Sequence, residues 1–152
     1  MNGPVFRFRL ERVRALRERK EQQAQQELAQ AIASRTSTAD ELRTAEAHLE
    51  QVHSDHRAQA VDVQTLNADE LIARQAFLER IEAQRGAYAQ ELQQREATVL
   101  ERDAKLTAAA SEHEMLKRLS ERHRGEHERA AASREQGALD EMTTARFGRG
   151  EI

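Results

Sequence analysis

Residues 28–52 read LAQAIASRTSTADELRTAEAHLEQV, and this stretch decides the fold. Small or apolar side chains recur in it at steps that alternate between three and four residues, and the pattern continues beyond it. This first seam consists of Leu28, Ala31, Arg35, Thr38, Leu42, Ala45, Leu49, Val52, His56, Gln59, Val63 and Leu66. Eight of these twelve positions are apolar, as in the heptad repeat of a coiled coil.

A second seam starts after Asn67-Ala-Asp-Glu70. Asn67 and Glu70 have the spacing of a capping box, with Asn in place of Ser or Thr, and predict the start of another helix. The second seam consists of Leu71, Arg74, Leu78, Ile81, Arg85, Tyr88, Leu92, Arg95, Val99, Arg102, Leu106, Ala109, His113 and Leu116. Its arginines are expected to extend toward water or to pair with acids.

The composition supports long helices rather than a globule. Ala, Glu, Arg, Leu and Lys make up 85 of the 152 residues, whereas Leu, Ile, Val and Phe together number only 28. Such a chain can fill a narrow seam between helices but not the broad core of a large enzyme. It has no cysteine, no apolar stretch of about 20 residues and no signal-peptide pattern at its start. The expectation is a soluble, intracellular protein.

We therefore predict an all-α fold in which two long helices form an antiparallel coiled-coil hairpin within a single domain, residues 1–152. The expected elements are helix 1 at about 5–66 (starting near Pro4), a turn at about 67–69, helix 2 at about 70–146 and a frayed tail at 147–152. A turn near residue 68 would pair residues whose numbers add up to about 136. A break at Ser34–Thr38 is less consistent with the unbroken seam. A single continuous helix that pairs with a second chain remains open.

Charge is unevenly distributed along the chain. Residues 1–20 carry seven basic and two acidic side chains, residues 21–116 carry nine and eighteen, and residues 117–149 carry eight and six. The hairpin would therefore have a basic end, where the termini meet, and an acidic shaft. The basic end could bind nucleic acid, anionic lipid or an acidic protein. Nucleic acid is the weaker candidate, because no binding fold accompanies the cluster and the pI is 6.1.

No catalytic, cofactor-binding or metal site is expected. The sequence lacks a phosphate-binding glycine loop and a nucleophile elbow, so no small-molecule substrate is indicated. His123-Arg-Gly-Glu-His127 matches the pattern of inverted zinc peptidases. A catalytic zinc needs a third ligand and a walled cavity, however, which two helices do not supply. An exposed histidine pair is the preferred interpretation.

The aromatic residues lie in two regions. Phe77 precedes the seam residue Leu78 and should lie at the edge of the seam, near Ile81 and Tyr88, where it could anchor a partner or only cover the core. A terminal group is expected to cluster at the other end of the hairpin, to close the core or to insert into another protein. This group consists of Phe6, Phe8 and Phe147.

At three places the sequence resembles the family of the flagellar export protein FliJ. Residues 6–21 (FRFRLERVRALRERKE) resemble the opening of that family, and Leu119 to Phe147 resemble its closing segment. The central Gln75-Ala-Phe-Leu78 also matches. The resemblance implies an antiparallel coiled coil, similar to the stalk of rotary ATPases, that inserts the end with both termini into the flagellar export ATPase ring. It further implies contacts with the export-gate membrane protein and with export chaperones, at the cytoplasmic face of the inner membrane.

Site residues follow from the resemblance by position. The expected ATPase-ring contacts are Phe6, Arg7, Phe8, Arg9, Arg12, Arg14, Arg17 and Phe147. The expected export-gate contacts are Phe77, Ile81 and Tyr88. The leading hypothesis is thus a non-enzymatic component of flagellar protein export. The alternatives are a stalk protein of a virulence-type secretion system and a generic coiled-coil scaffold.

Overall fold

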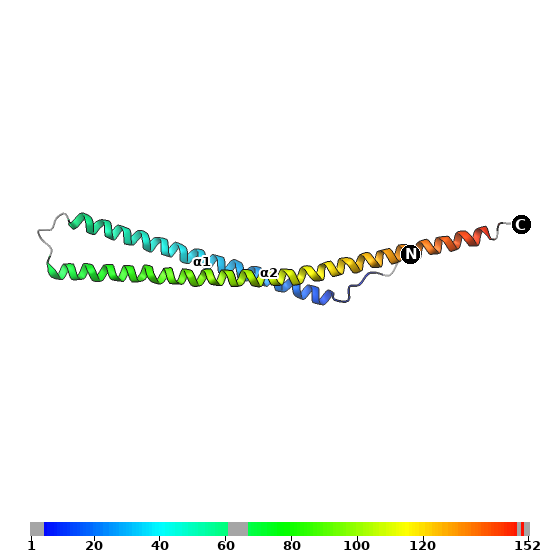
Figure 1. Ribbon diagram of the computed structural model, residues 1–152, viewed down its shortest axis with the longest axis horizontal. Coiled ribbons are helices and arrows are strands. Elements are labelled where there is room, and N and C mark those ends of the chain that lie inside the picture. Colours follow the sequence, from blue (N-terminus) through cyan, green and yellow to red (C-terminus); the bar gives the residue numbers. More distant parts are fainter. Residues whose placement is uncertain (1–4, 61–66, 149, 151–152) are drawn as a thin grey trace. The chain divides into compact units, whose positions relative to one another are not determined.

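The computed structural model describes residues 5–60, 67–148 and 150. Its regular structure consists of two helices, α1 (Glu11–Ala60, 50 residues) and α2 (Ala68–Phe147, 80 residues), and the described part of the chain contains no strand (Figure 1). The all-α prediction is therefore confirmed. Helix α1 runs through Ser34–Thr38 without a break.

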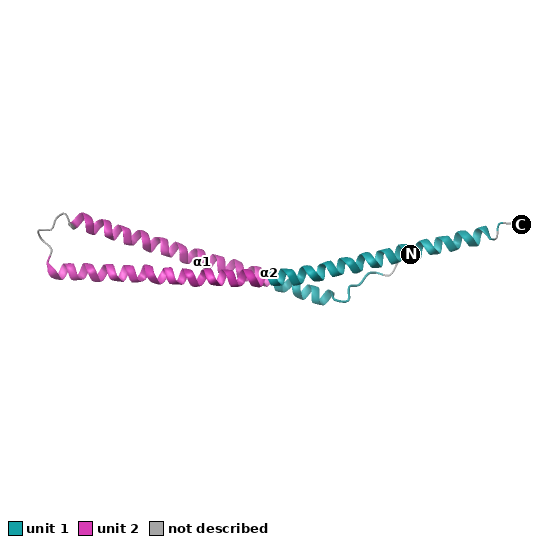
Figure 2. Ribbon diagram, viewed as in Figure 1, with its two compact units in different colours: residues 1–22, 107–152 teal, residues 23–106 magenta. Residues whose placement is uncertain are grey.

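The contacts divide the chain into two compact units. Unit 1 comprises residues 1–22 and 107–152, and unit 2 comprises residues 23–106 (Figure 2). Each unit contains one piece of α1 and one piece of α2, and in each of them the two pieces run in opposite directions. The helices thus pack against each other as an antiparallel hairpin, as predicted, and a single continuous helix is excluded.

Both predicted seams form the contact between the helices. From Leu28 to His56, every seam position except Arg35 is buried or half-buried. In the second seam, eleven of the fourteen positions are buried or half-buried. The remaining three are Leu71, Arg85 and Arg95. Val63 and Leu66 of the first seam lie outside the described residues.

The core is thin. Among the described residues only three hydrophobic side chains are buried, namely Phe8, Val52 and Ile81, and Thr38 is the one buried polar side chain. The chain exposes 12541 Å², about 1.6 times the roughly 7,800 Å² of a compact protein of this mass. Stability must therefore come from many half-buried contacts spread along the helices.

The observed pairing differs from the expected register. The residue numbers of the cross-helix pairs add up to values from 129, for Glu27–Arg102, to 135, for His53–Glu82, and so lie slightly below the expected value of about 136. Because α2 already begins at Ala68, the helices pair about a point at lower residue numbers than expected. Asn67 acts as the N-cap, since its carbonyl accepts hydrogen bonds from the amides of Glu70 and Leu71.

The start of α1 also differs from the prediction. The helix begins at Glu11 and not at about residue 5, and its first turn follows a hydrogen bond from the Glu11 amide to the Phe8 carbonyl, 3.2 Å long. Residues 5–8 have no helical structure, because Phe6 and Phe8 contact α2 instead. Pro4 lies outside the described residues. At the other end, α2 ends at Phe147, one residue beyond the expected end.

Candidate interaction surfaces

A series of ion pairs connects α1 and α2 along both units. In unit 2, Arg35, Arg85 and Arg102 of the predicted seams reach acids on the opposite helix. The cross-helix ion pairs of unit 2 are Glu27–Arg102 (2.8 Å), Arg35–Glu96 (3.2 Å) and Glu46–Arg85 (3.4 Å), and the His53 ring also contacts Glu82, at 4.0 Å. Each partly exposed pair contributes at most about 1 kcal/mol. Their role is therefore mainly to fix which residues face each other.

Two further pairs cross between the helices in unit 1. Arg17 pairs with Glu112, and the Nδ1 atom of His113 lies 2.6 Å from a carboxylate oxygen of Glu21. The Nε2 atom of His113 is buried and has no hydrogen-bond partner among the described residues. An unsatisfied buried polar atom costs about 1–3 kcal/mol of stability. His113 therefore helps to fix which residues of the two helices face each other, but it lowers the stability of the hairpin.

The N-terminal segment, residues 5–8, packs along α2 through two aromatic contacts. The ring of Phe6 lies 5.7 Å from that of His127, and the ring of Phe8 lies 5.9 Å from that of His123. Phe8 is only 9% exposed. Phe6 and Phe8, two of the expected ring-contact residues, therefore pack inside unit 1 against α2.

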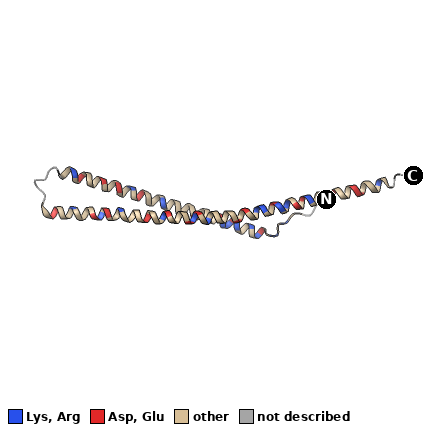
Figure 3. Ribbon diagram, viewed as in Figure 1, with Lys and Arg blue, Asp and Glu red and all other residues tan. Residues whose placement is uncertain are grey.

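The expected basic contact residues fall into two groups. In the described part of the chain, Arg7, Arg9 and Arg12 are exposed and form no ion pair. Arg14 and Arg17 are instead engaged by the carboxylates of Glu11 and Glu112. Figure 3 shows how basic and acidic residues are distributed along the ribbon. Three of the five arginines thus remain available to a partner.

The Arg14–Glu11 pair shows this engagement most clearly. The guanidinium of Arg14 donates to both oxygens of Glu11, at 2.6–3.2 Å. The hydrogen bonds lower the pKa of Glu11 and raise the pKa of Arg14. An acid in the first turn also suits the positive end of the helix dipole. Arg14 therefore stabilises the start of α1.

Phe147 does not cluster with Phe6 and Phe8, and that expectation is wrong. Phe6 contacts His127, and the 20 residues of α2 from there to Phe147 span about 30 Å. Phe147 is 80% exposed. On the same stretch, Leu139 and Met142 are 61% and 60% exposed and line a shallow groove. The last five turns of α2 therefore present their apolar side chains to solvent.

The three expected gate residues lie in different environments in unit 2. Phe77 is 41% exposed and its ring lies 6.5 Å from that of His48, edge to face. Its predicted place at the edge of the seam is confirmed. Ile81 is only 5% exposed, and Tyr88 is half-buried. Phe77 is thus the most accessible of the three to a partner, and Ile81 is covered.

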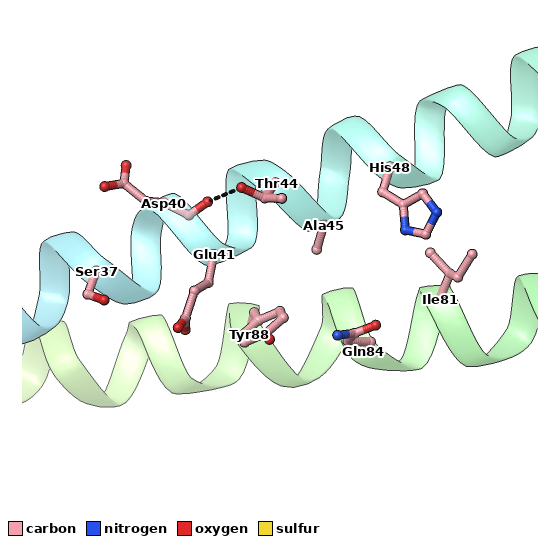
Figure 4. A pocket seen from close by; sticks show the side chains of 9 residues that line it. All are labelled: Ser37, Asp40, Glu41, Thr44, Ala45, His48, Ile81, Gln84 and Tyr88. Carbon is pink, nitrogen blue, oxygen red and sulfur yellow. Dashed lines mark hydrogen bonds between the residues drawn. The ribbon is translucent and has the colours of Figure 1, made fainter.

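Ile81 and Tyr88 line a groove between the helices of about 430 Å³ (Figure 4). The α1 side is made of small and acidic residues together with His48, and Glu41 extends toward Tyr88. The full lining is Ser37, Asp40, Glu41, Thr44, Ala45, His48, Ile81, Gln84 and Tyr88. The small side chains of α1 leave the space opposite Tyr88 unfilled.

The two histidines of the zinc-peptidase pattern lie beside aromatic rings. His123 contacts Phe8, and His127 contacts Phe6. Within the ranges that the structure describes, no group of three or more His, Cys, Asp or Glu could hold a metal ion. Neither α1 nor α2, as described, contains a segment apolar and long enough to cross a bilayer.

The contacts of His123 and His127 with the two N-terminal phenylalanines are not among the predictions from the sequence. Phe6 and Phe8 are two residues apart, and the histidines are four residues apart on a helix. These two spacings together are the signal that could have identified the contact.

The chain matches a protein-family model described as "Flagellar FliJ protein" over residues 6–151. No curated protein and no solved structure matches it. The matched range includes both terminal stretches and the central one that carry the resemblance.

Proposed function

The chain belongs to the FliJ family, which makes it a component of the flagellar protein export apparatus, and from this premise we propose that it binds and stimulates the export ATPase ring through unit 1. The observation that carries the proposal is the free set of Arg7, Arg9 and Arg12, which are exposed and without an ion pair in the described chain. A carboxylate-bearing partner would supply the missing counter-charges. The exposed apolar side chains near the end of α2 would add to the contact.

The proposed mechanism needs no catalytic group in this chain. The exposed arginines of unit 1 contact the ring subunits unequally, and the bound chain thereby favours one subunit conformation over the others. Unit 2, at the edge marked by Phe77, contacts the export gate, with Ile81 supporting the surface from beneath. We expect export chaperones to bind as well. The protein would act at the cytoplasmic face of the inner membrane.

The proposal is tested by reversing the three free charges. In the variant Arg7→Glu/Arg9→Glu/Arg12→Glu, attraction becomes repulsion at the ring. The concentration needed for half-maximal ATPase stimulation should rise roughly 100-fold, since about 1 kcal/mol is lost at each position. The measurement is phosphate release by the purified export ATPase at increasing concentrations of the chain.

A matched control carries the same change in net charge on unit 2. The variant Arg43→Glu/Arg57→Glu/Arg80→Glu alters three exposed arginines that the proposal does not use. It should stimulate like the wild-type chain. Equal loss of ATPase stimulation in both triple variants would mean that the effect depends only on net charge. If the wild-type chain does not stimulate the ATPase, the proposed function fails and the scaffold alternative remains.

The gate contact is tested separately through Phe77. Phe77→Ala should abolish measurable binding to the cytoplasmic domain of the gate protein, because exposed aromatic anchors dominate such contacts. It should cost less than about 1 kcal/mol of stability, since the side chain is 41% exposed. Calorimetry measures the binding, and urea unfolding measures the stability. Leu100→Ala, a change at a side chain that is 72% exposed, is the control, and equal binding by both variants would contradict the assignment.

A further inference from the structure

The spacing of Phe6 and Phe8 along the N-terminal segment matches the spacing of His123 and His127 along α2. Phe8 lies on His123 and Phe6 lies on His127, so two residues of the segment advance as far as four residues of the helix. An extended chain rises about 3.3 Å per residue, or 6.6 Å for two. Four helical residues rise about 6.0 Å. The two aromatic rings can therefore meet the two histidines only when the segment is extended.

The burial pattern of the segment shows the alternation that an extended chain requires. Phe6 is half-buried and Phe8 buried, whereas Val5, Arg7 and Arg9 are exposed. Successive side chains of an extended chain point to opposite sides. Since Phe6 and Phe8 face α2, Arg7 between them is directed away from it, and Arg9, in the turn that follows Phe8, is exposed as well.

We infer that His123 and His127 are positioning residues, which dock the N-terminal segment on α2 and thereby present Arg7 and Arg9 as a fixed pair of cations to carboxylates of a partner. A free N-terminal segment would scatter these two charges over many conformations, and binding would then have to order them. Docked, the pair is preorganised. This inference rests on the proposed function, because the partner is the ATPase ring.

The docking is measured with a fluorescent probe. The sequence contains no tryptophan, so Phe8→Trp introduces a single reporter at the docked position. In this parent, His123→Ala/His127→Ala removes both rings, and quenching of the tryptophan by acrylamide should increase roughly twofold as the segment detaches. His123→Phe/His127→Phe keeps an aromatic contact and should restore the parent value.

A matched control lies on the same turns of α2. Arg124 and Glu128 pair with each other at 3.1 Å and are largely exposed. Arg124→Ala/Glu128→Ala should leave the quenching unchanged. If tryptophan itself docks poorly, ¹H NMR of the histidine rings gives a second measurement, since Phe6→Ala/Phe8→Ala in the otherwise native chain should shift the ring protons of two histidines and not of the other four.

ATPase stimulation separates the possible outcomes. Loss of docking by the alanine variant, together with about a tenfold loss of apparent affinity for the ring and rescue by the phenylalanine variant, supports the inference. Unchanged quenching and unchanged NMR shifts overturn the docking role. Detachment with full stimulation overturns the presentation of the arginines and leaves the proposed function intact. If the parent itself does not stimulate, the proposed function fails, and fluorescence still decides the docking.

Discussion

Ile81→Asp is expected to unfold unit 2 more readily than any other single change considered. Ile81 is 5% exposed and is one of only three buried hydrophobic side chains among the described residues. Removing it forfeits about 2–4 kcal/mol of apolar burial and packing. Placing a carboxylate there adds a desolvation penalty, or forces the helices apart so that water can reach it. The total loss should exceed about 4 kcal/mol.

Urea unfolding followed by circular dichroism measures this loss. Leu100→Asp introduces the same acid on the same helix, at a side chain that is 72% exposed, and should change stability by less than about 0.5 kcal/mol. A midpoint for Ile81→Asp equal to that of Leu100→Asp would mean that the seam contact at Ile81 does not support the hairpin.

The opposite effect is expected when the internal glycines of α2 are replaced. Gly86, Gly125 and Gly137 lie within the helix, and apart from the backbone of the surrounding turns a Cβ atom added at any of them meets no described atom within 4 Å. Each Gly→Ala change should therefore recover the helix propensity that glycine forfeits, about 1 kcal/mol, without a steric cost. The triple variant should gain about 3 kcal/mol, distributed over the length of α2.

Thermal unfolding and amide hydrogen exchange test this gain at different positions. Gly86→Ala should raise the melting temperature, whereas Gly137→Ala, beyond the last described contact with α1, should mainly slow local exchange. The reverse variant Ala83→Gly/Ala108→Gly/Ala138→Gly alters exposed positions of the same helix and should lower stability by a similar amount. Unchanged amide hydrogen exchange around residue 137 in the Gly137→Ala variant would show that helix propensity does not limit the local stability of this part of α2.

The helices could be predicted from the sequence because one periodicity specifies them. From Leu28 to Val52 the steps of three and four place the same side chains on one face, and those side chains are the ones in contact with α2. The capping position at Asn67 follows from local hydrogen bonding, which acts over only three residues. Both signals are short-range and do not depend on how the two helices meet.

The start of α1 and the register of the two helices depend on contacts across the hairpin, and local sequence patterns therefore predict both of these features poorly. The preference of proline for the first turn of a helix predicts a helix start near Pro4. Residues 5–8 are nevertheless not helical, because Phe6 and Phe8 contact α2. The resemblance predicts that Ile81 contacts the export gate, although its position in the seam indicates burial. Phe147 does not join the other aromatic side chains, because it lies about 30 Å along α2 beyond the contact of Phe6.

The thin core also determines how stability varies with temperature. The heat capacity of unfolding grows with the apolar surface that unfolding newly exposes. A chain that already exposes 12541 Å² when folded has less surface left to expose than a compact protein of equal mass, about a quarter to a third less by the usual area scaling. Its free energy of unfolding should therefore change only gently with temperature. On cooling below the temperature of maximum stability, the hairpin should lose less of its stability than a compact protein of equal mass does.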